Sequence, residues 1–386
     1  MAELPSSSGI GNLNVSDHAS RDRVLSKIRA TVAFRREDQF ICLLALFIIL
    51  ATKAILEFKG VNTTALIDHL LNTAMYVLCT INLVLLEICI RSVKRRPESL
   101  FRFGVSRFLR PSYAGRIVAA IPLILAVSIF MPTFSSFKSS IELFQPFSWD
   151  SALIDLDRDL HGNDPWRIMQ PFAGYPVITS LLSSAYQLWF MLIYFGTVWF
   201  AIFQTNRTLR LQFFLAYFLT WTIGGMVLAV IFASVGPCFV GPLLGNQNFA
   251  EQMAYLHAVN KDYPLFVIEI QNQLLLWYKA GDHGLGRGIT AMPSMHVALA
   301  FLYVLAMRRV SKPLGWLFGA FCLLIMLGSV HLGYHYAVDG YVAIAVTAAI
   351  WAAAGALAKR LRTMPAPIAL LARSNGSMKL AATSTI

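Results

Sequence analysis

Eight long apolar runs are the feature that most restricts how this sequence can fold. They lie at residues 40–56, 65–90, 117–134, 177–203, 213–239, 295–307, 314–333 and 341–357. At 1.5 Å per residue, a helix of about 20 such residues crosses the hydrocarbon layer of a bilayer. Backbone groups in that layer must pair within the protein, which favours helices. The sequence therefore predicts an all-α polytopic membrane protein with about eight transmembrane helices.

Composition agrees with this fold class and excludes others. Hydrophobic residues make up 57% of the 386 residues and charged residues only 13%, and the mean hydropathy is +0.60. Soluble domains carry about a quarter charged residues. The net charge of +12 alone would suit a nucleic-acid partner, but the basic residues stand in short segments between apolar runs, which is typical of membrane topology. We expect a membrane partner and no nucleic acid.

The basic residues also predict an orientation. They gather in alternate connections, at 94–116, 207–210, 308–312 and 359–362. The positive-inside rule places these connections and both termini in the cytoplasm, and the long connections 135–176 and 240–293 outside. We expect a multi-pass protein of a bacterial inner membrane with a periplasmic site, or of a Golgi-type eukaryotic membrane with a lumenal one.

Three segments have an amphipathic pattern. In residues 21–38, apolar positions recur among cations, which suits either a helix on an anionic membrane surface or a solvated linker. In the outer connections, residues 149–160 and 263–278 mix apolar and polar side chains. These two segments are predicted to lie along the outer interface, either admitting a lipid sideways or serving as inert covers.

The first candidate site segment is Ala291-Met-Pro-Ser-Met-His296. Pro293 suits the first position of a helix, where its missing N–H does no harm. The free N–H groups of that first turn, together with the Ser294 hydroxyl, are predicted to bind an anion. His296 lies in the same turn.

The second candidate segment runs from Gly328 to Asp339, where the seventh apolar run gives way to the eighth. His335 and Asp339 are four residues apart, so on a helix the carboxylate lies one turn from the imidazole. That pairing fixes the tautomer and leaves the other ring nitrogen free to attack. Because the chain crosses the membrane twice between His296 and His335, both histidines should reach the outer face.

These two segments resemble a known family. Pro-Ser-Met-His296 and His335-Tyr-Ala-Val-Asp339 resemble the second and third signatures of the type 2 phosphatidic acid phosphatase superfamily, whose fold is related to the vanadium haloperoxidases. The compact third signature most resembles the inositol phosphorylceramide and sphingomyelin synthases. The resemblance implies that His335 attacks phosphorus to form a phosphohistidine, that Asp339 orients it, and that His296 protonates the leaving oxygen.

The same resemblance implies the partners and the domain organisation. It implies a lipid substrate from the bilayer, a small alcohol as acceptor, and neither a metal nor another cofactor. A catalytic helical core is then expected at 177–357, after an outer loop. The five predicted parts, namely cytoplasmic tail, first three helices, outer loop, core and C-terminal tail, span 1–39, 40–134, 135–176, 177–357 and 358–386.

The sequence departs from the phosphatase branch in two places. The first signature of that branch is K-x6-R-P, whereas Lys279 and Arg287 are one residue too far apart and no proline follows. An arginine also precedes the third-signature histidine by six residues in that branch, where this chain has Ser329. Arg287 and Lys279, with Ser294, are the predicted ligands of the substrate phosphate.

Several alternatives remain open at the level of sequence. Water as the acceptor would make the protein a lipid phosphate phosphatase, acting on phosphatidate, a polyprenyl diphosphate or similar. An alcohol would make it a transferase, which the short third signature favours. His331, His335 and Asp339 have a spacing that could bind zinc, although Gly333 interrupts the helix. A transporter could use Glu87 and Lys53, although both lie near predicted helix ends.

Overall fold

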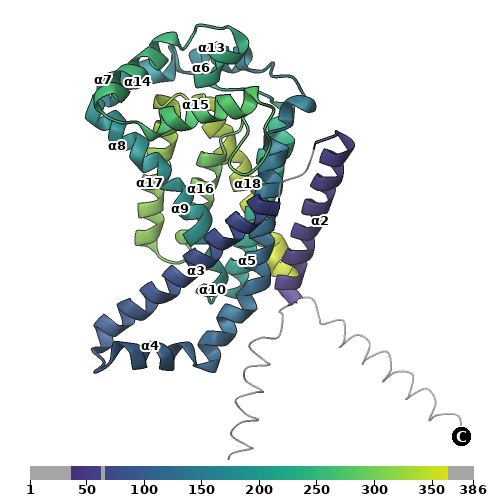
Figure 1. The fold of residues 1–386 in the computed structure, drawn as a ribbon, viewed down its shortest axis with the longest axis vertical. Coiled ribbons are helices and arrows are strands. Elements are labelled where there is room, and N and C mark those ends of the chain that lie inside the picture. The colour runs from purple at the N-terminus through teal and green to yellow at the C-terminus, as the bar shows by residue number, and fades with distance from the viewer. Residues whose placement is uncertain (1–35, 62–65, 364–386) are drawn as a thin grey trace, which may run out of the picture.

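A computed structural model describes residues 36–61 and 66–363 of the protein. Every regular element among these residues is a helix. Figure 1 shows a bundle of long helices covered at one end by short helices, with α4 (Leu100–Phe108) projecting at the other end. Residues 1–35, which include most of the predicted amphipathic segment 21–38, residues 62–65 and residues 364–386 lie outside the described residues.

Seven helices of the described chain are long and apolar enough to cross a membrane, and an eighth apolar helix is shorter. The short helix, α16, has 13 residues and is mostly buried, so it is surrounded by the others. All eight predicted runs therefore form helices, which confirms the fold class. The bounds of the eight are Arg36–Phe58 (α2), Leu66–Arg95 (α3), Pro111–Lys138 (α5), Pro176–Ile202 (α8 to α10), Arg207–Ile231 (α11 to α12), Met295–Met307 (α16), Lys312–His331 (α17) and Ala337–Thr363 (α18).

Two of these spans contain wide turns of π-helix. They are η2 (Leu192–Gly196), between α9 (Trp189–Met191) and α10 (Thr197–Ile202), and η3 (Thr220–Leu228), between α11 (Arg207–Leu219) and α12 (Ala229–Ile231). π-Helical turns often occur at functional sites. Both segments contribute side chains to the cavity described below.

The fifth span ends earlier than its apolar run predicts. The run continues to residue 239, but the helix ends at Ile231 and a new helix, α13 (Pro237–Leu244), follows. Gly236 has φ +89°, and a Cβ there would lie 2.5 Å from the backbone oxygen of Tyr334. The apolar pattern misses this break because the chain stays buried while its backbone turns.

The end of the bundle opposite α4 is covered by α6 (Asp150–His161), α7 (Pro165–Ala173), α13, α14 (Ala250–Asp262) and α15 (Phe266–Lys279). The two amphipathic segments predicted from sequence correspond to α6 and α15. On α6, Asp150, Leu153 and Asp157 are buried in the protein, whereas Leu156 and Leu160 are exposed. This helix therefore directs two acids inward, which its amphipathic pattern alone does not show.

The opposite end contains α4 (Leu100–Phe108), which joins α3 to α5. Arg107 of α4 is buried and forms an ion pair with Glu87 of α3, and Arg91 pairs with the same carboxylate. Glu87 thus has a structural role at a helix junction. This pairing disfavours the transporter reading, in which Glu87 would carry protons.

Candidate active site

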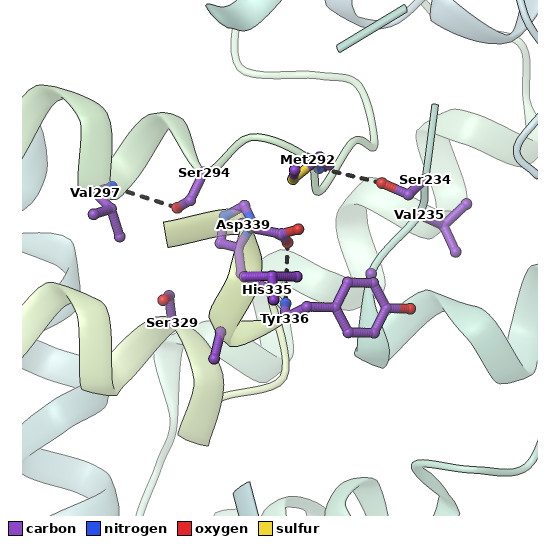
Figure 2. Close-up of polar contacts among 12 residues, drawn as sticks. Ser234, Val235, Met292, Ser294, Val297, Ser329, His335, Tyr336 and Asp339 are labelled. Atoms are coloured by element: carbon purple, nitrogen blue, oxygen red, sulfur yellow. Dashed lines mark hydrogen bonds and ion pairs between the residues drawn. The ribbon is translucent and has the colours of Figure 1, made fainter. Parts of the chain in front are cut away.

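His335 and Asp339 meet where α17 passes into α18. His335 precedes the first residue of α18, and Asp339 lies in its first turn. Nδ1 of His335 is 3.3 Å from Oδ2 of Asp339, which also accepts the backbone N–H of Tyr336 at 3.0 Å. Figure 2 shows the imidazole and carboxylate side by side. A carboxylate on Nδ1 leaves Nε2 as the nitrogen with a free lone pair.

α16 begins next to this pair. Ser294 is its N-cap, and its hydroxyl accepts the backbone N–H of Val297 at 3.4 Å. The Ser294 backbone N–H donates to the backbone oxygen of Asp339 at 3.2 Å. The helix thus starts at Met295, two residues after the predicted start at Pro293, and the Ser294 contact joins the starts of α16 and α18.

The segment before α16 is fixed by Ser234. The Ala291 backbone N–H donates to the Ser234 backbone oxygen at 2.9 Å, and the Met292 N–H donates to the Ser234 hydroxyl at 3.2 Å. This segment follows the early end of the fifth span. The turn at 232–236, missed by sequence patterns, therefore helps to set the position of His296.

His296 is held within a group of aromatic rings. Its imidazole centroid lies 4.5 Å from the ring of Tyr186 and 4.1 Å from that of Trp189, whose indole N–H donates to the His296 backbone oxygen at 3.0 Å. The His296 and His335 rings are 6.0 Å apart. The structure thus brings His296, His335 and Asp339 together, as predicted.

Two acids of α6 support the His335 segment. Asp157 accepts the backbone N–H groups of Ala337 (2.7 Å) and Val338 (2.9 Å) at the start of α18. Burial raises the pKa of Asp157 above its ordinary value, and these two hydrogen bonds oppose the shift. In the sequence Asp157 is one acid of the amphipathic segment 149–160, and no local pattern shows that it caps a helix 180 residues away.

Asp150, the second of these acids, also accepts hydrogen bonds near His335. Its carboxylate accepts the Tyr336 hydroxyl at 2.8 Å and the backbone N–H groups of Val235 and Gly236 at 2.9–3.1 Å. Burial raises the pKa of Tyr336 well above its usual value, and the nearby Asp150 carboxylate adds to the shift, so its hydroxyl remains a donor. Asp150 connects the turn at 235–236 to the segment that carries His335.

A cavity of about 210 Å³ opens in front of the two histidines. His296 and His335 line it, and its walls are largely aromatic and aliphatic, including Trp189 and Trp221 from the spans with π-helical turns. Cavities of this kind, apolar with a few polar groups, are typical of small-molecule sites.

Of the three predicted phosphate ligands, only Arg287 lines the cavity. Arg287 lines the cavity, but its guanidinium is paired with Asp282, donates to the backbone oxygen of His283 at 2.9 Å, and lies 5.2 Å from the ring of Trp277. Lys279 ends α15, is exposed, and does not line the cavity. Ser294 is fully buried and does not line it either. Their roles in phosphate binding stay predictions, with Arg287 the best placed.

A second cation, Lys138, lines the cavity and was not predicted. It lies in the last turn of α5 and lines the same cavity as His296 and Arg287. The described residues provide no carboxylate within ion-pair distance of its ammonium group. Its only sequence signal is a lone cation at the end of an apolar run, which resembles an ordinary helix end. An unpaired cation beside two histidines suits an anionic substrate group.

His331 points away from the pair formed by His335 and Asp339. Its Nε2 lies 2.9 Å from the Thr179 hydroxyl, which is 2.7 Å from the hydroxyl of Tyr255. α17 ends at His331 and α18 starts at Ala337, so the three residues do not share one helix face. No group of three or more His, Cys, Asp or Glu side chains in the described part of the chain could hold a metal ion.

The glycine-rich segment 281–288 lies against the cavity. The Gly286 backbone N–H donates to the Ser135 hydroxyl at 3.3 Å, and that of Leu285 donates to Asp68 at 3.3 Å. Gly288 has φ +96°, and a Cβ there would lie 2.6 Å from the backbone nitrogen of Ser139. The segment therefore rests closely on the end of α5, where Lys138 is located.

Comparison with known proteins agrees with this geometry. The family model of the PAP2 superfamily matches residues 151–353, more than half of the chain, from α6 through most of α18. No curated protein and no solved structure matches the chain. The match includes both histidine segments and the α6 acid Asp157. The chain therefore belongs to the PAP2 superfamily and is a membrane enzyme of the phosphatase or phosphotransferase type.

Proposed function

We propose that the protein is a lipid phosphotransferase that works through a phosphohistidine at the outer membrane face, like the inositol phosphorylceramide synthases. The observation that carries this proposal is the contact of 3.3 Å between His335 Nδ1 and Asp339 Oδ2, with the His296 ring 6.0 Å away at the same cavity. This arrangement supplies a nucleophile, a group that orients it and an acid.

In the first step, Nε2 of His335 attacks the phosphorus of a lipid phosphate ester. A nitrogen–phosphorus bond forms, and the bond from phosphorus to the leaving oxygen breaks. His296 in its protonated form gives a proton to that oxygen, so the lipid leaves as an alcohol. Asp339 stabilises the positive charge that develops on the His335 ring.

In the second step, an acceptor alcohol takes the place of the departed lipid. His296, now neutral, accepts the proton of the acceptor hydroxyl while its oxygen attacks phosphorus. The nitrogen–phosphorus bond breaks, and His335 returns with its lone pair. The acceptor gains the phosphoryl group or the phospho-headgroup, and no atom changes its oxidation state.

The phosphoryl oxygens carry negative charge that needs balancing in both steps. Two cations line the cavity, Lys138 from the end of α5 and Arg287 from the segment 281–288. We assign Lys138 as the principal phosphate ligand, because Arg287 is already paired with Asp282. A fixed cation at the place where charge develops lowers the barrier by electrostatic stabilisation.

Two features favour an alcohol over water as the acceptor. The compact third signature resembles the transferase branch. The cavity walls are mainly apolar, and the segment 281–288 rests on the end of α5 beside it, which supports exclusion of water during transfer. The alternative is a lipid phosphate phosphatase, which would use the same phosphohistidine with water.

One experiment separates the two reactions. Purified protein is incubated with phosphorus-labelled phosphatidate, phosphatidylglycerol or phosphatidylinositol, with and without inositol, choline, glycerol or a lipid alcohol. A transferase gives a new phosphodiester and faster donor turnover with one preferred alcohol. Release of inorganic phosphate at full rate from a lipid monophosphate, with no alcohol incorporated, would establish the phosphatase instead.

A further inference from the structure

A second cavity lies at the other end of the bundle, between α3, α5 and the end of α10. Its volume is about 490 Å³. Figure 1 shows α3 and α5 diverging toward α4, which joins them at this end. The cavity shares no lining residue with the one that contains His296 and His335. The two cavities are therefore separate sites.

Half of the residues that line this cavity are apolar. Leu83, Leu86 and Ile90 line it from α3, and Trp199 and Phe203 line it from the end of α10. Leu86 and Ile90 are 54% and 49% exposed on the protein surface. They belong to α3, a helix apolar enough to cross the membrane. Apolar side chains exposed on such a helix would contact lipid acyl chains.

Three cations also line the cavity. They are Arg91, Lys94 and Arg116. Lys94 has no carboxylate within ion-pair distance among the described residues. Arg116 donates to the backbone oxygen of Ser112 at 3.2 Å and lies 5.6 Å from the ring of Tyr113. Two cations of the cavity lining thus lack an acidic partner in the part of the chain that the structure describes.

The one acidic side chain lining the cavity is already neutralised. Glu87 pairs with Arg91 and also with Arg107, whose Nε lies 2.9 Å from Glu87 Oε2. Arg107 is buried and does not line the cavity. One acid is therefore shared by two arginines, and the charges of Lys94 and Arg116 remain to be balanced from outside the protein.

We propose that this cavity binds an acidic glycerophospholipid of the leaflet on the α4 side. Its phosphate would lie between Lys94 and Arg116, and the start of an acyl chain would follow Leu86 and Ile90 toward Trp199. A phosphodiester beside two unpaired cations forms charge-assisted hydrogen bonds, and basic pockets between transmembrane helices suit acidic headgroups. This inference does not rest on the proposed catalytic function.

Trp199 provides a direct readout. Full-length protein is placed in mixed micelles with phosphatidylglycerol or phosphatidylcholine carrying the same brominated acyl chains, which quench nearby tryptophan fluorescence. The Trp199→Phe variant gives the part of the signal that belongs to Trp199. We expect phosphatidylglycerol to quench that part at a lower mole fraction than phosphatidylcholine.

The charge is tested by Lys94→Gln/Arg116→Gln, which should weaken the preference for phosphatidylglycerol by roughly tenfold or more, since each basic residue near an acidic lipid contributes about fivefold. The matched control is Arg95→Gln/Arg102→Gln, which removes two exposed cations from the same end without touching the cavity. The control should keep the preference.

Two results would overturn the proposal. Equal quenching by the two lipids would exclude acidic-lipid selection, and an equal loss in the control would show diffuse attraction to the surface. If the double variant does not yield folded protein, Lys94→Gln alone serves, because this residue makes no ion pair that folding could lose.

Discussion

The Asp157 carboxylate accepts a hydrogen bond of 2.7 Å from the backbone N–H of Ala337, so a residue of α6 caps α18, the helix that carries Asp339. The cap satisfies two N–H groups that a helix start otherwise leaves without partners. Because Asp339 is in the same first turn, we propose that Asp157 positions the pair formed by His335 and Asp339.

Replacing Asp157 by Ala should therefore affect both stability and catalysis. Loss of a helix cap costs roughly 1–2 kcal/mol, and the two buried N–H groups add to this. We expect a lower thermal unfolding temperature and a reduced turnover number, with partial recovery in Asp157→Asn. The control is Asp155→Asn, at an exposed position of the same helix, which should match the wild type. Wild-type turnover in Asp157→Ala would show that the cap does not position Asp339.

The raised pKa of Asp157 predicts a pH dependence of stability. Burial places this pKa in the folded protein above the ordinary value of 3.8, so the folded state binds the proton more tightly than the unfolded state. The stability contributed by Asp157 is then full below about pH 4 and declines as pH rises through the raised pKa.

Thermal unfolding of the wild type and of Asp157→Asn, compared from pH 4 to pH 7, measures this effect. Because asparagine does not titrate, the stability of the wild type relative to the variant should decrease with rising pH. A relative gain of the wild type over the same interval would mean that the two backbone hydrogen bonds outweigh burial and lower the pKa.

Lys138 and Lys279 offer a matched pair for the phosphate cradle. Lys138 lines the cavity and Lys279 does not, so Lys138→Met should lower kcat/KM by roughly 10- to 100-fold, the range of one charge-assisted contact. Lys138→Arg should retain more activity than Lys138→Met. Lys279→Met should be close to the wild type. The reverse order of the two methionine variants would restore the assignment made from sequence.

The transmembrane helices and the catalytic pair were predictable because each rests on a local pattern. Apolar runs indicate the spans, and the four-residue spacing of His335 and Asp339 places one side chain near the other. Asp157, Asp150 and Lys138 were not recognised as site residues, because their partners are far away in the sequence. The end of the fifth span was predicted at residue 239, whereas the helix ends at Ile231. The sequence does not show this because the chain remains apolar where its backbone leaves the helix.

The orientation in the membrane is open to a chemical test. Arg102 on α4 and Asp159 on α6 are exposed at opposite ends of the bundle. In a background without the five native cysteines, Arg102→Cys should react only with a reagent admitted to the cytoplasm, and Asp159→Cys only with an impermeant reagent added outside. The mirror result would place the active site on the cytoplasmic side.

The central claim is that His335 carries the phosphoryl group between donor and acceptor. The most direct measurement uses a phosphorus-labelled lipid donor without acceptor, stopped in alkali to preserve the nitrogen–phosphorus bond and followed by peptide mass analysis. We predict a label on His335 in the wild type that a suitable alcohol removes, no label in His335→Gln, and a loss on the order of 10³-fold or more in turnover for Asp339→Asn. Near-normal turnover by His335→Gln, or a label on another residue, would contradict the account.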